Sequence, residues 1–167
     1  MKILFLHGLK SNNQSSKVSS MREDGHEVLA PEMNYYDNKE LYQQTLDKLL
    51  DFKPELIVGS SMGGYFAYHL GTHFSTNLLL LNPALPNRSI EPPILSNGNE
   101  KSTIWALVGE NDNVVRPKEN IEILKTSGAK VSVGQHEHRT PIEIFEPFFK
   151  EVLNDINKSK ISLQSFD

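Results

Sequence analysis

The chain has 167 residues, no cysteine, and a formal net charge of −4 at pH 7. A chain of this length forms one domain with a sizeable core. Its acidic balance and scattered basic residues argue against nucleic-acid or anionic-membrane binding, and the lack of cysteine rules out disulfides and thiolate metal sites. The apolar stretch 3–6 is too short for a signal-peptide core. No run approaches the roughly 20 apolar residues that span a bilayer, so we expect a soluble, cytoplasmic protein.

The first elements are short and clearly bounded. Residues 2–6 predict a buried strand. Residues 15–23 can form a short helix that ends at Gly25. A brief strand over 26–30 is then stopped by Pro31.

A longer helix follows. Asp37 and Glu40 have the spacing of a capping box with aspartate as the cap, and Pro54 closes the element. Between them runs an apolar stripe of helical period, made of Leu41, Tyr42, Leu46, Leu49 and Leu50.

The motif Gly-x-Ser-x-Gly at 59–63 comes directly after the apolar run 55–58. The helix-compatible segment 64–70 follows it. This is the arrangement of a nucleophile elbow, in which a sharp turn between strand and helix exposes a reactive serine. Glycine on either side relieves the crowding around the turn. Ser61 is therefore predicted as a catalytic nucleophile.

The rest of the chain continues the alternation of strands and helices. Strands are predicted at 78–81, 103–108 and 130–133, and a helix opens at Pro117 and ends at Gly128. Apolar runs without alternation suit a sheet that is covered on both faces. The pattern predicts an α/β fold with about six parallel strands and helices on both faces.

Two signals compete in the last element. Thr140, Pro141 and Glu143 read as the start of a helix, whereas Pro147 inside it would cost about 3 kcal/mol. We expect a short turn and then the main helix over about 146–156. The domain is predicted to span 1–156, followed by a polar, frayed tail over 157–167.

Two further strand ends supply the partners that a serine nucleophile needs. Asp112 follows the strand 103–108, and His138 follows the strand 130–133. Serine, acid and histidine thus occur in the order typical of α/β hydrolases, at the sheet edge where open parallel sheets bind ligands. Glu110 is the alternative acid and His136 the alternative base. We favour His138 because the helix start behind it anchors its backbone, whereas His136 is expected to be mobile or solvent-facing.

The loop after the first strand completes the predicted site. The backbone N–H groups of Leu9 and Met62 would form the oxyanion hole, and Gly8 would let the backbone approach the substrate. His7 is expected to be a structural hydrogen-bonding residue at the sheet rim rather than a base. Residues that could line the substrate site are His7, Gly8, Tyr35 and Tyr36.

Three motifs give the chain a family resemblance. Leu6-His7-Gly8-x-x-Ser11, the segment 59–67 and Leu81-Asn82-Pro83-Ala84 together resemble small bacterial esterases of the YqiA/YcfP type, from residue 1 to about 155. The resemblance implies a compact single-domain α/β hydrolase that cleaves short acyl esters with a serine–histidine–aspartate triad.

The segment 86–98 is short and rich in proline, which predicts a minimal α/β-hydrolase fold without a cap domain. The site would then be open, or covered only by a loop carrying Ile90, Ile94 and Leu95.

The sequence thus predicts a serine carboxylesterase that forms an acyl-enzyme intermediate, without a cofactor or metal. The run 136–138 lacks a second pair of ligands at useful spacing. Alternatives are a thioesterase and a non-catalytic small-molecule-binding protein on the same fold. Nucleotide binding is disfavoured because the glycines at 59–64 do not have the G-x-G-x-x-G spacing. The sequence leaves open the physiological substrate and the oligomeric state.

Overall fold

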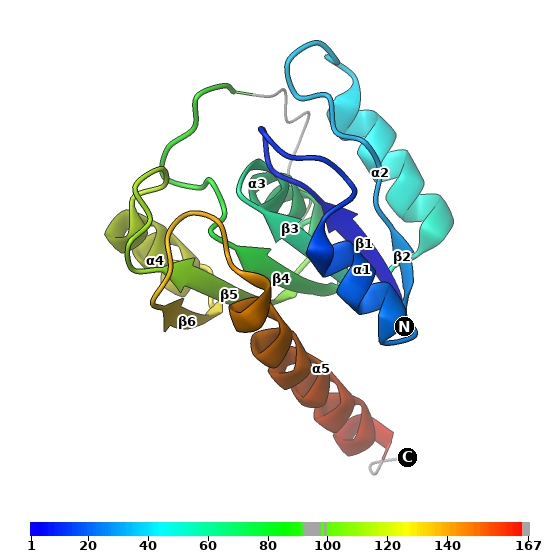
Figure 1. Cartoon of the computed structure of the whole chain (residues 1–167). Coiled ribbons are helices and arrows are strands. Elements are labelled where there is room, and N and C mark those ends of the chain that lie inside the picture. Colours follow the sequence, from blue (N-terminus) through cyan, green and yellow to red (C-terminus); the bar gives the residue numbers. More distant parts are fainter. Residues whose placement is uncertain (92–97, 99, 165–167) are drawn as a thin grey trace.

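The computed structural model describes residues 1–91, 98 and 100–164, and these form a parallel β-sheet with helices on both faces (Figure 1). The strands are β1 (Lys2–Leu6), β2 (Glu27–Leu29), β3 (Leu56–Ser60), β4 (Asn77–Leu81), β5 (Thr103–Gly109) and β6 (Lys130–Gly134). The helices are α1 (Ser16–Glu23), α2 (Leu41–Phe52), α3 (Met62–Leu70), α4 (Pro117–Thr126) and α5 (Ile142–Gln164). The predicted α/β fold is confirmed.

The sheet has the order β2-β1-β3-β4-β5-β6, and every neighbouring pair is parallel. The chain moves outward from β1 to β2, returns to the other side of β1 as β3, and then runs in one direction to β6. The direction therefore reverses between β1 and β3. In open parallel sheets the crevice at such a reversal, beyond the carboxyl ends of the strands, is where ligands bind.

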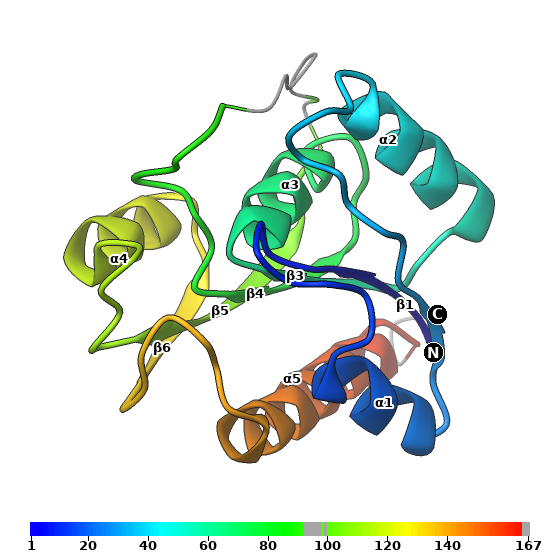
Figure 2. The same ribbon diagram turned by 45° about the horizontal axis from the view of Figure 1, so that its top comes forward.

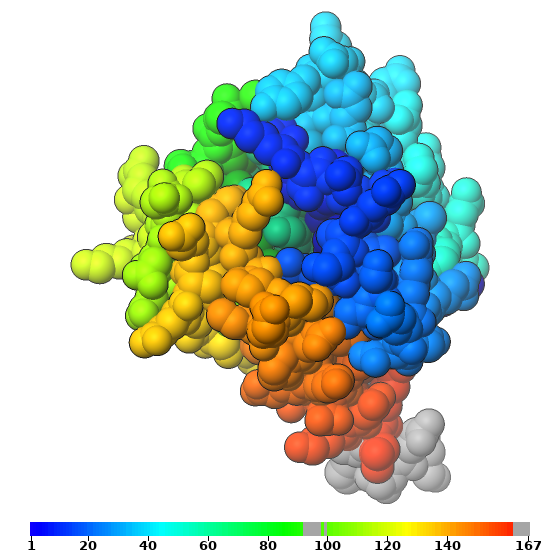
Figure 3. Space-filling view, viewed as in Figure 1, coloured from blue at the N-terminus to red at the C-terminus, as the bar shows by residue number. Residues whose placement is uncertain are grey.

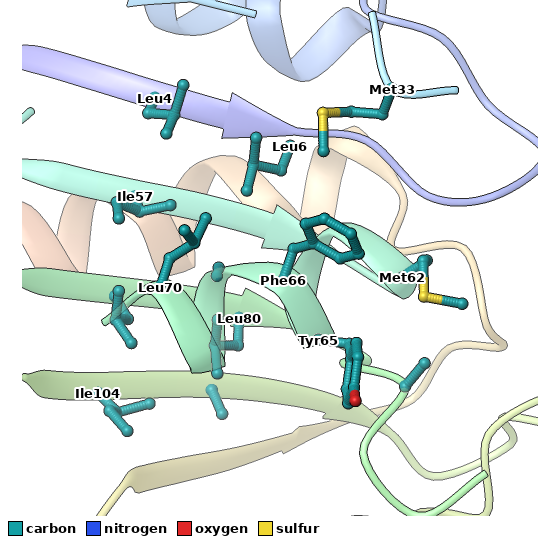
Figure 4. Close-up of a cluster of buried hydrophobic side chains, with 14 of the residues drawn as sticks. Leu4, Leu6, Met33, Ile57, Met62, Tyr65, Phe66, Leu70, Leu80 and Ile104 are labelled. Atoms are coloured by element: carbon teal, nitrogen blue, oxygen red, sulfur yellow. The ribbon is translucent and has the colours of Figure 1, made fainter. Parts of the chain in front are cut away.

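Helices cover the sheet unequally: α1 and α5 lie against one face, and α2, α3 and α4 against the other (Figure 2). Alternate residues of β4 explain why four consecutive leucines, Leu78 to Leu81, make up most of this strand. Leu78 and Leu80 enter the core beneath α2, α3 and α4, while Leu79 and Leu81 enter the core beneath α1 and α5. Figure 4 shows part of the first core, with Phe66 and Leu70 of α3 in front of the strands that carry Leu6, Ile57 and Leu80.

The predicted capping box at α2 is wrong. The helix begins at Leu41, and its cap residue, Glu40, makes no side-chain capping hydrogen bond. Two asparagines organise the preceding turns instead: Asn34 accepts from the amide of Asp37, and Asn38 accepts from that of Glu40. Asparagine side chains bond readily to nearby backbone in this way, so Asp37 is drawn into a turn and does not cap the helix.

The predicted break in the last helix is also wrong. α5 runs without interruption from Ile142 to Gln164, with Pro147 inside it, so most of the segment predicted as a frayed tail is helical. The cost of proline, about 3 kcal/mol, is outweighed by burial of one apolar stripe. Each such side chain contributes about 1.5–3 kcal/mol when fully buried, and the stripe contains Phe145, Phe148, Phe149, Val152 and Ile156.

The segment between β4 and β5 contains no helix or strand in its described part, residues 82–91, 98 and 100–102. Ile90 packs against the core cluster under α3, whereas Ile94 and Leu95 lie outside the described residues. Among the helices described, none has the length and apolar character needed to cross a membrane.

Candidate active site

Ser61 lies at the tight turn between β3 and α3, with φ 54° and ψ −114°. A positive φ is unfavourable for a residue with a Cβ atom, so the surrounding backbone must hold the turn in place. The Ser61 amide donates to the carbonyl of Leu81 at 2.9 Å, and the Ser61 carbonyl accepts from the amides of Tyr65 and Ala84, both at 3.0 Å. These bonds fix the predicted elbow.

The two glycines of the motif are required by close backbone contacts. A Cβ atom on Gly63 would lie 2.0 Å from the carbonyl oxygen of Leu6, and one on Gly59 would lie 2.5 Å from that of Gly63. No side chain fits at such distances. The Gly-x-Ser-x-Gly pattern therefore reflects how tightly α3 packs back over β1 and β3.

The structure places Ser61, His138 and Asp112 in one hydrogen-bonded chain. His138 Nε2 lies 2.8 Å from Ser61 Oγ, and His138 Nδ1 lies 2.8 Å from Asp112 Oδ2. Because a carboxylate only accepts hydrogen bonds, the neutral ring must carry its proton on Nδ1. Its Nε2 is then free to accept the Ser61 hydroxyl proton. The three side chains come from the ends of β3, β5 and β6.

Asp112 is held by its own loop. Its side chain is fully buried, and its Oδ1 accepts from the amides of Val114 and Val115 at 2.8 and 2.9 Å. One carboxylate oxygen is thus bound to the backbone while the other faces the histidine. The alternative acid, Glu110, is exposed and does not take part in this chain.

His136 is buried, which corrects the expectation that it is mobile or solvent-facing. Its ring packs against Gly109 and Gly134, and its Nδ1 lies 2.7 Å from the carbonyl of Glu137, to which it donates. The glycines at the ends of β5 and β6 leave room for the ring, and burial of its carbon atoms favours this position. Of the two histidines, His138 is the one that forms a hydrogen bond with Ser61.

The loop after β1 passes close to Ser61. A Cβ atom on Gly8 would lie 3.2 Å from that of Ser61, so glycine permits this approach. Leu9 is half-buried and packs against the core. Met62 is the first residue of α3, and the first amides of a helix have no partner within it. Figure 3 shows a recess between the blue N-terminal segment and the orange segment near residue 140, with teal atoms at its base.

His7 and Tyr35 stabilise this loop through hydrogen bonds to its backbone. His7 is buried, its Nδ1 donates to the carbonyl of Gly8 at 2.8 Å, and its Nε2 accepts from the amide of Met33 at 3.0 Å. Both ring nitrogens are occupied, in agreement with a structural role. Tyr35 donates its hydroxyl to the carbonyl of His7, and burial raises the pKa of that hydroxyl well above its usual value. Tyr36 is exposed.

The sequence reasoning missed one polar residue at this edge of the sheet. Asn82 follows β4 with φ 43°, and its fully buried side chain contacts the segments that carry Asp112 and His138. The Asn-Pro pair directly after the run of four leucines in β4 was a usable signal, because asparagine tolerates a positive φ better than most residues. Within the part of the chain described, no group of three or more His, Cys, Asp or Glu residues could hold a metal ion.

One family model matches the chain. It is described as "Uncharacterised protein family (UPF0227)" and covers residues 2–114, about two thirds of the sequence. The matched range includes Ser61 and Asp112 and ends before His138. The match confirms the resemblance to YqiA/YcfP-type proteins. A comparison with curated proteins found no similar sequence.

Several solved structures of hydrolases and esterases have a similar fold. A Xanthomonas campestris protein assigned to the alpha/beta hydrolase superfamily has a TM-score of 0.71 at 19% identity, over 92% of this chain and 98% of that one. Est1E from Butyrivibrio proteoclasticus has a TM-score of 0.68 at 15% identity, with coverages of 96% and 88%. A Bacillus cereus carboxylesterase has a TM-score of 0.56 at 18% identity, with coverages of 84% and 82%. At such low identity these matches establish the α/β-hydrolase fold alone.

Proposed function

The chain belongs to Uncharacterised protein family UPF0227, and we propose that this member is a serine carboxylesterase that cleaves short acyl esters. The observation that carries the proposal is the hydrogen-bonded chain from Ser61 through His138 to Asp112, with both links at 2.8 Å. Such a chain, ending in a serine held at a strained turn, is the arrangement that activates a hydroxyl for acyl transfer.

The first half of the reaction forms an ester on Ser61. As Oγ attacks the substrate carbonyl carbon, its proton passes to His138 Nε2. Asp112 keeps the ring oriented and stabilises the positive charge that develops on it. The imidazolium then gives its proton to the departing alkoxide, so the alcohol leaves and the acyl group remains on Ser61.

The second half repeats these steps with water. His138 takes a proton from a water molecule that attacks the acyl-enzyme, and returns it to Ser61 Oγ as the acid leaves. In both tetrahedral intermediates the substrate oxygen carries a negative charge, which the amides of Leu9 and Met62 would stabilise. Each donor of this kind contributes about 2.7–4 kcal/mol in a well-studied hydrolase. All steps use groups of this chain, and we propose no cofactor or metal.

Two alternative functions are compatible with the same fold. A thioesterase would use the same serine chemistry, and the ratio of kcat/KM for an acyl thioester and its oxygen ester distinguishes the two. A non-catalytic small-molecule-binding protein would not need an activated serine. The link between Ser61 and His138 favours catalysis over simple binding.

The proposal is tested by hydrolysis of p-nitrophenyl acetate and butyrate. Ser61→Ala should lower kcat by several orders of magnitude while circular dichroism stays unchanged, because only the nucleophile is lost. Ser60→Ala is the matched control, since it removes a hydroxyl one residue away and should keep wild-type kcat. A Ser61→Ala protein with the wild-type rate would exclude the proposed mechanism.

A further inference from the structure

Asn82 lies among the three segments that carry Ser61, Asp112 and His138. It follows β4, which lies between the strand of Ser61 and the strand of Asp112 in the sheet. Its side chain is fully buried. A buried amide is costly unless its donors and acceptor are satisfied, so its partners should be specific.

The amide group connects the base segment to the acid segment. Nδ2 donates to the carbonyl of His138 at 2.7 Å and to that of Glu137 at 3.3 Å. Oδ1 accepts from the amide of Gly109 at 2.7 Å, at the end of β5 and three residues before Asp112. One side chain thus joins the backbone that carries the histidine to the backbone that leads to the aspartate.

The backbone on either side of Asn82 holds the nucleophile. The carbonyl of Leu81 accepts from the Ser61 amide, and the amide of Ala84 donates to the Ser61 carbonyl. The backbone N–H of Asn82 donates to the carbonyl of Leu107 in β5 at 3.0 Å. The positive φ of 43° at Asn82 turns the chain so that these bonds and the side-chain bonds form together.

We propose that Asn82 is a positioning residue, which holds the backbone of His138 at the correct distance from both Ser61 and Asp112. The inference rests on the proposed function for its kinetic consequences. The His138 ring is bound to Ser61 and Asp112, and the His138 carbonyl is bound to Asn82. Without the side-chain amide of Asn82, the His138 carbonyl and the Gly109 N–H lose their partner. The loop that carries His138 must then shift to find others.

The test is Asn82→Gly, because glycine accepts the positive φ and lacks only the side chain. Misplacement of catalytic groups by about 1 Å costs on the order of 10²-fold in rate. We therefore expect kcat for p-nitrophenyl acetate to fall about 10–100-fold, with KM changed by less than about threefold because the substrate contacts remain.

Asn77→Gly is the matched control. Asn77 begins the same strand, β4, and its Nδ2 donates to the carbonyl of Glu55, at the opposite edge of the sheet. The substitution also puts glycine for asparagine and removes an amide hydrogen bond, so it reports any general loss of stability. It should lower the melting temperature without changing kcat.

A spectroscopic measurement gives an answer that does not depend on turnover. The His138 Nδ1 proton, bound to Asp112, should give a downfield proton resonance in the wild type and in Asn77→Gly. That resonance should broaden or disappear in folded Asn82→Gly. Wild-type kcat together with an unchanged resonance in Asn82→Gly would overturn the inference.

The outcomes separate this inference from the proposed function. An inactive wild type that still shows loss of the resonance in Asn82→Gly would refute the esterase and retain the positioning role. If Asn82→Gly does not fold, Asn82→Asp replaces it in both measurements. The aspartate retains the acceptor for Gly109 and removes the amide donors. If neither variant folds, exchange of the Asn82 side-chain N–H protons in the wild type decides: slow exchange supports the bond to His138, and rapid exchange overturns it.

Discussion

At Asp112 the two oxygens of one carboxylate have different partners. Oδ1 is bound to two backbone amides of its own loop, and Oδ2 is bound to His138. The loop therefore fixes the orientation of the carboxylate before any substrate arrives. Such preorganisation is what allows an aspartate to hold a histidine in a single tautomer.

Asp112→Asn should lower kcat by about 10⁴, the loss seen when a triad histidine is left in the wrong tautomer. The amide can present an N–H to His138 Nδ1, which forces the ring proton onto the nitrogen that must accept from Ser61. The rate is measured with p-nitrophenyl acetate. Glu110→Gln is the control, because Glu110 is exposed, and it should keep wild-type kcat. The opposite pattern would identify Glu110 as the acid.

The two histidines provide a second comparison at this scale. His138→Ala should abolish ester hydrolysis, since it removes the group that accepts the Ser61 proton. His136→Ala should change kcat by less than about tenfold, but should lower the melting temperature, because it leaves a cavity where a buried ring lay. Kinetics and thermal unfolding of both variants check this. An active His138→Ala protein beside an inactive His136→Ala protein would move the base to His136.

Many of the candidate site residues were predictable because they occur in short local motifs. Ser61 and Asp112 each follow an apolar strand, His138 follows the more polar strand β6, and the structure joins the three side chains by hydrogen bonds. The Asn-Pro pair could have marked Asn82 as a turn residue, but its side-chain contacts and the burial of His136 were not predictable. Both depend on how the ends of β4, β5 and β6 approach one another, and no short stretch of sequence records that approach.

At the scale of elements, α5 shows packing overriding local preference. Pro147 lies on the exposed side of the helix, while the apolar stripe faces the sheet. The spacing of that stripe was visible in the sequence. The free energy gained by burying it, relative to the cost of proline, was not. At α2 the error was of another kind, since nearby asparagines were better placed than Asp37 to bond the turn.

Pro147→Ala should therefore raise the stability of the protein. Alanine restores an N–H donor to the helix interior and removes the clash of the proline ring with the preceding turn, together worth up to about 3 kcal/mol. Greater freedom of the unfolded chain offsets about 0.4–1 kcal/mol of this gain. Urea unfolding measures the free-energy difference. Unchanged or lower stability in Pro147→Ala would contradict this expectation.

At the scale of the whole molecule, the parallel sheet assembles the site. All six strands point the same way, so the segments after β1, β3, β5 and β6 meet at one edge. The fold class followed from the continuous apolar runs and the alternation of strands and helices. The sequence motifs predicted the loop after β1 beside Ser61, and the structure shows β3 next to β1 in the sheet; the complete strand order was not predicted.

The described part of the segment between β4 and β5 contains no helix or strand, which sets an expectation for substrate size. With little apolar surface to surround a long acyl chain, kcat/KM should be highest for acetyl to butyryl esters and should fall for chains of eight or more carbons. Each buried CH₂ would otherwise add about 0.8 kcal/mol of binding. A series of p-nitrophenyl esters measures this. A steady rise toward long chains would instead indicate an apolar groove.

The most direct test of the central claim is covalent labelling with a fluorophosphonate probe, followed by peptide mass spectrometry. A serine activated by His138 should react, and the added mass should lie on the peptide containing Ser61. Ser61→Ala and His138→Ala should remain unlabelled, while Ser60→Ala should be labelled like the wild type. A folded wild-type protein that the probe does not modify, or modifies at a residue other than Ser61, would contradict the account.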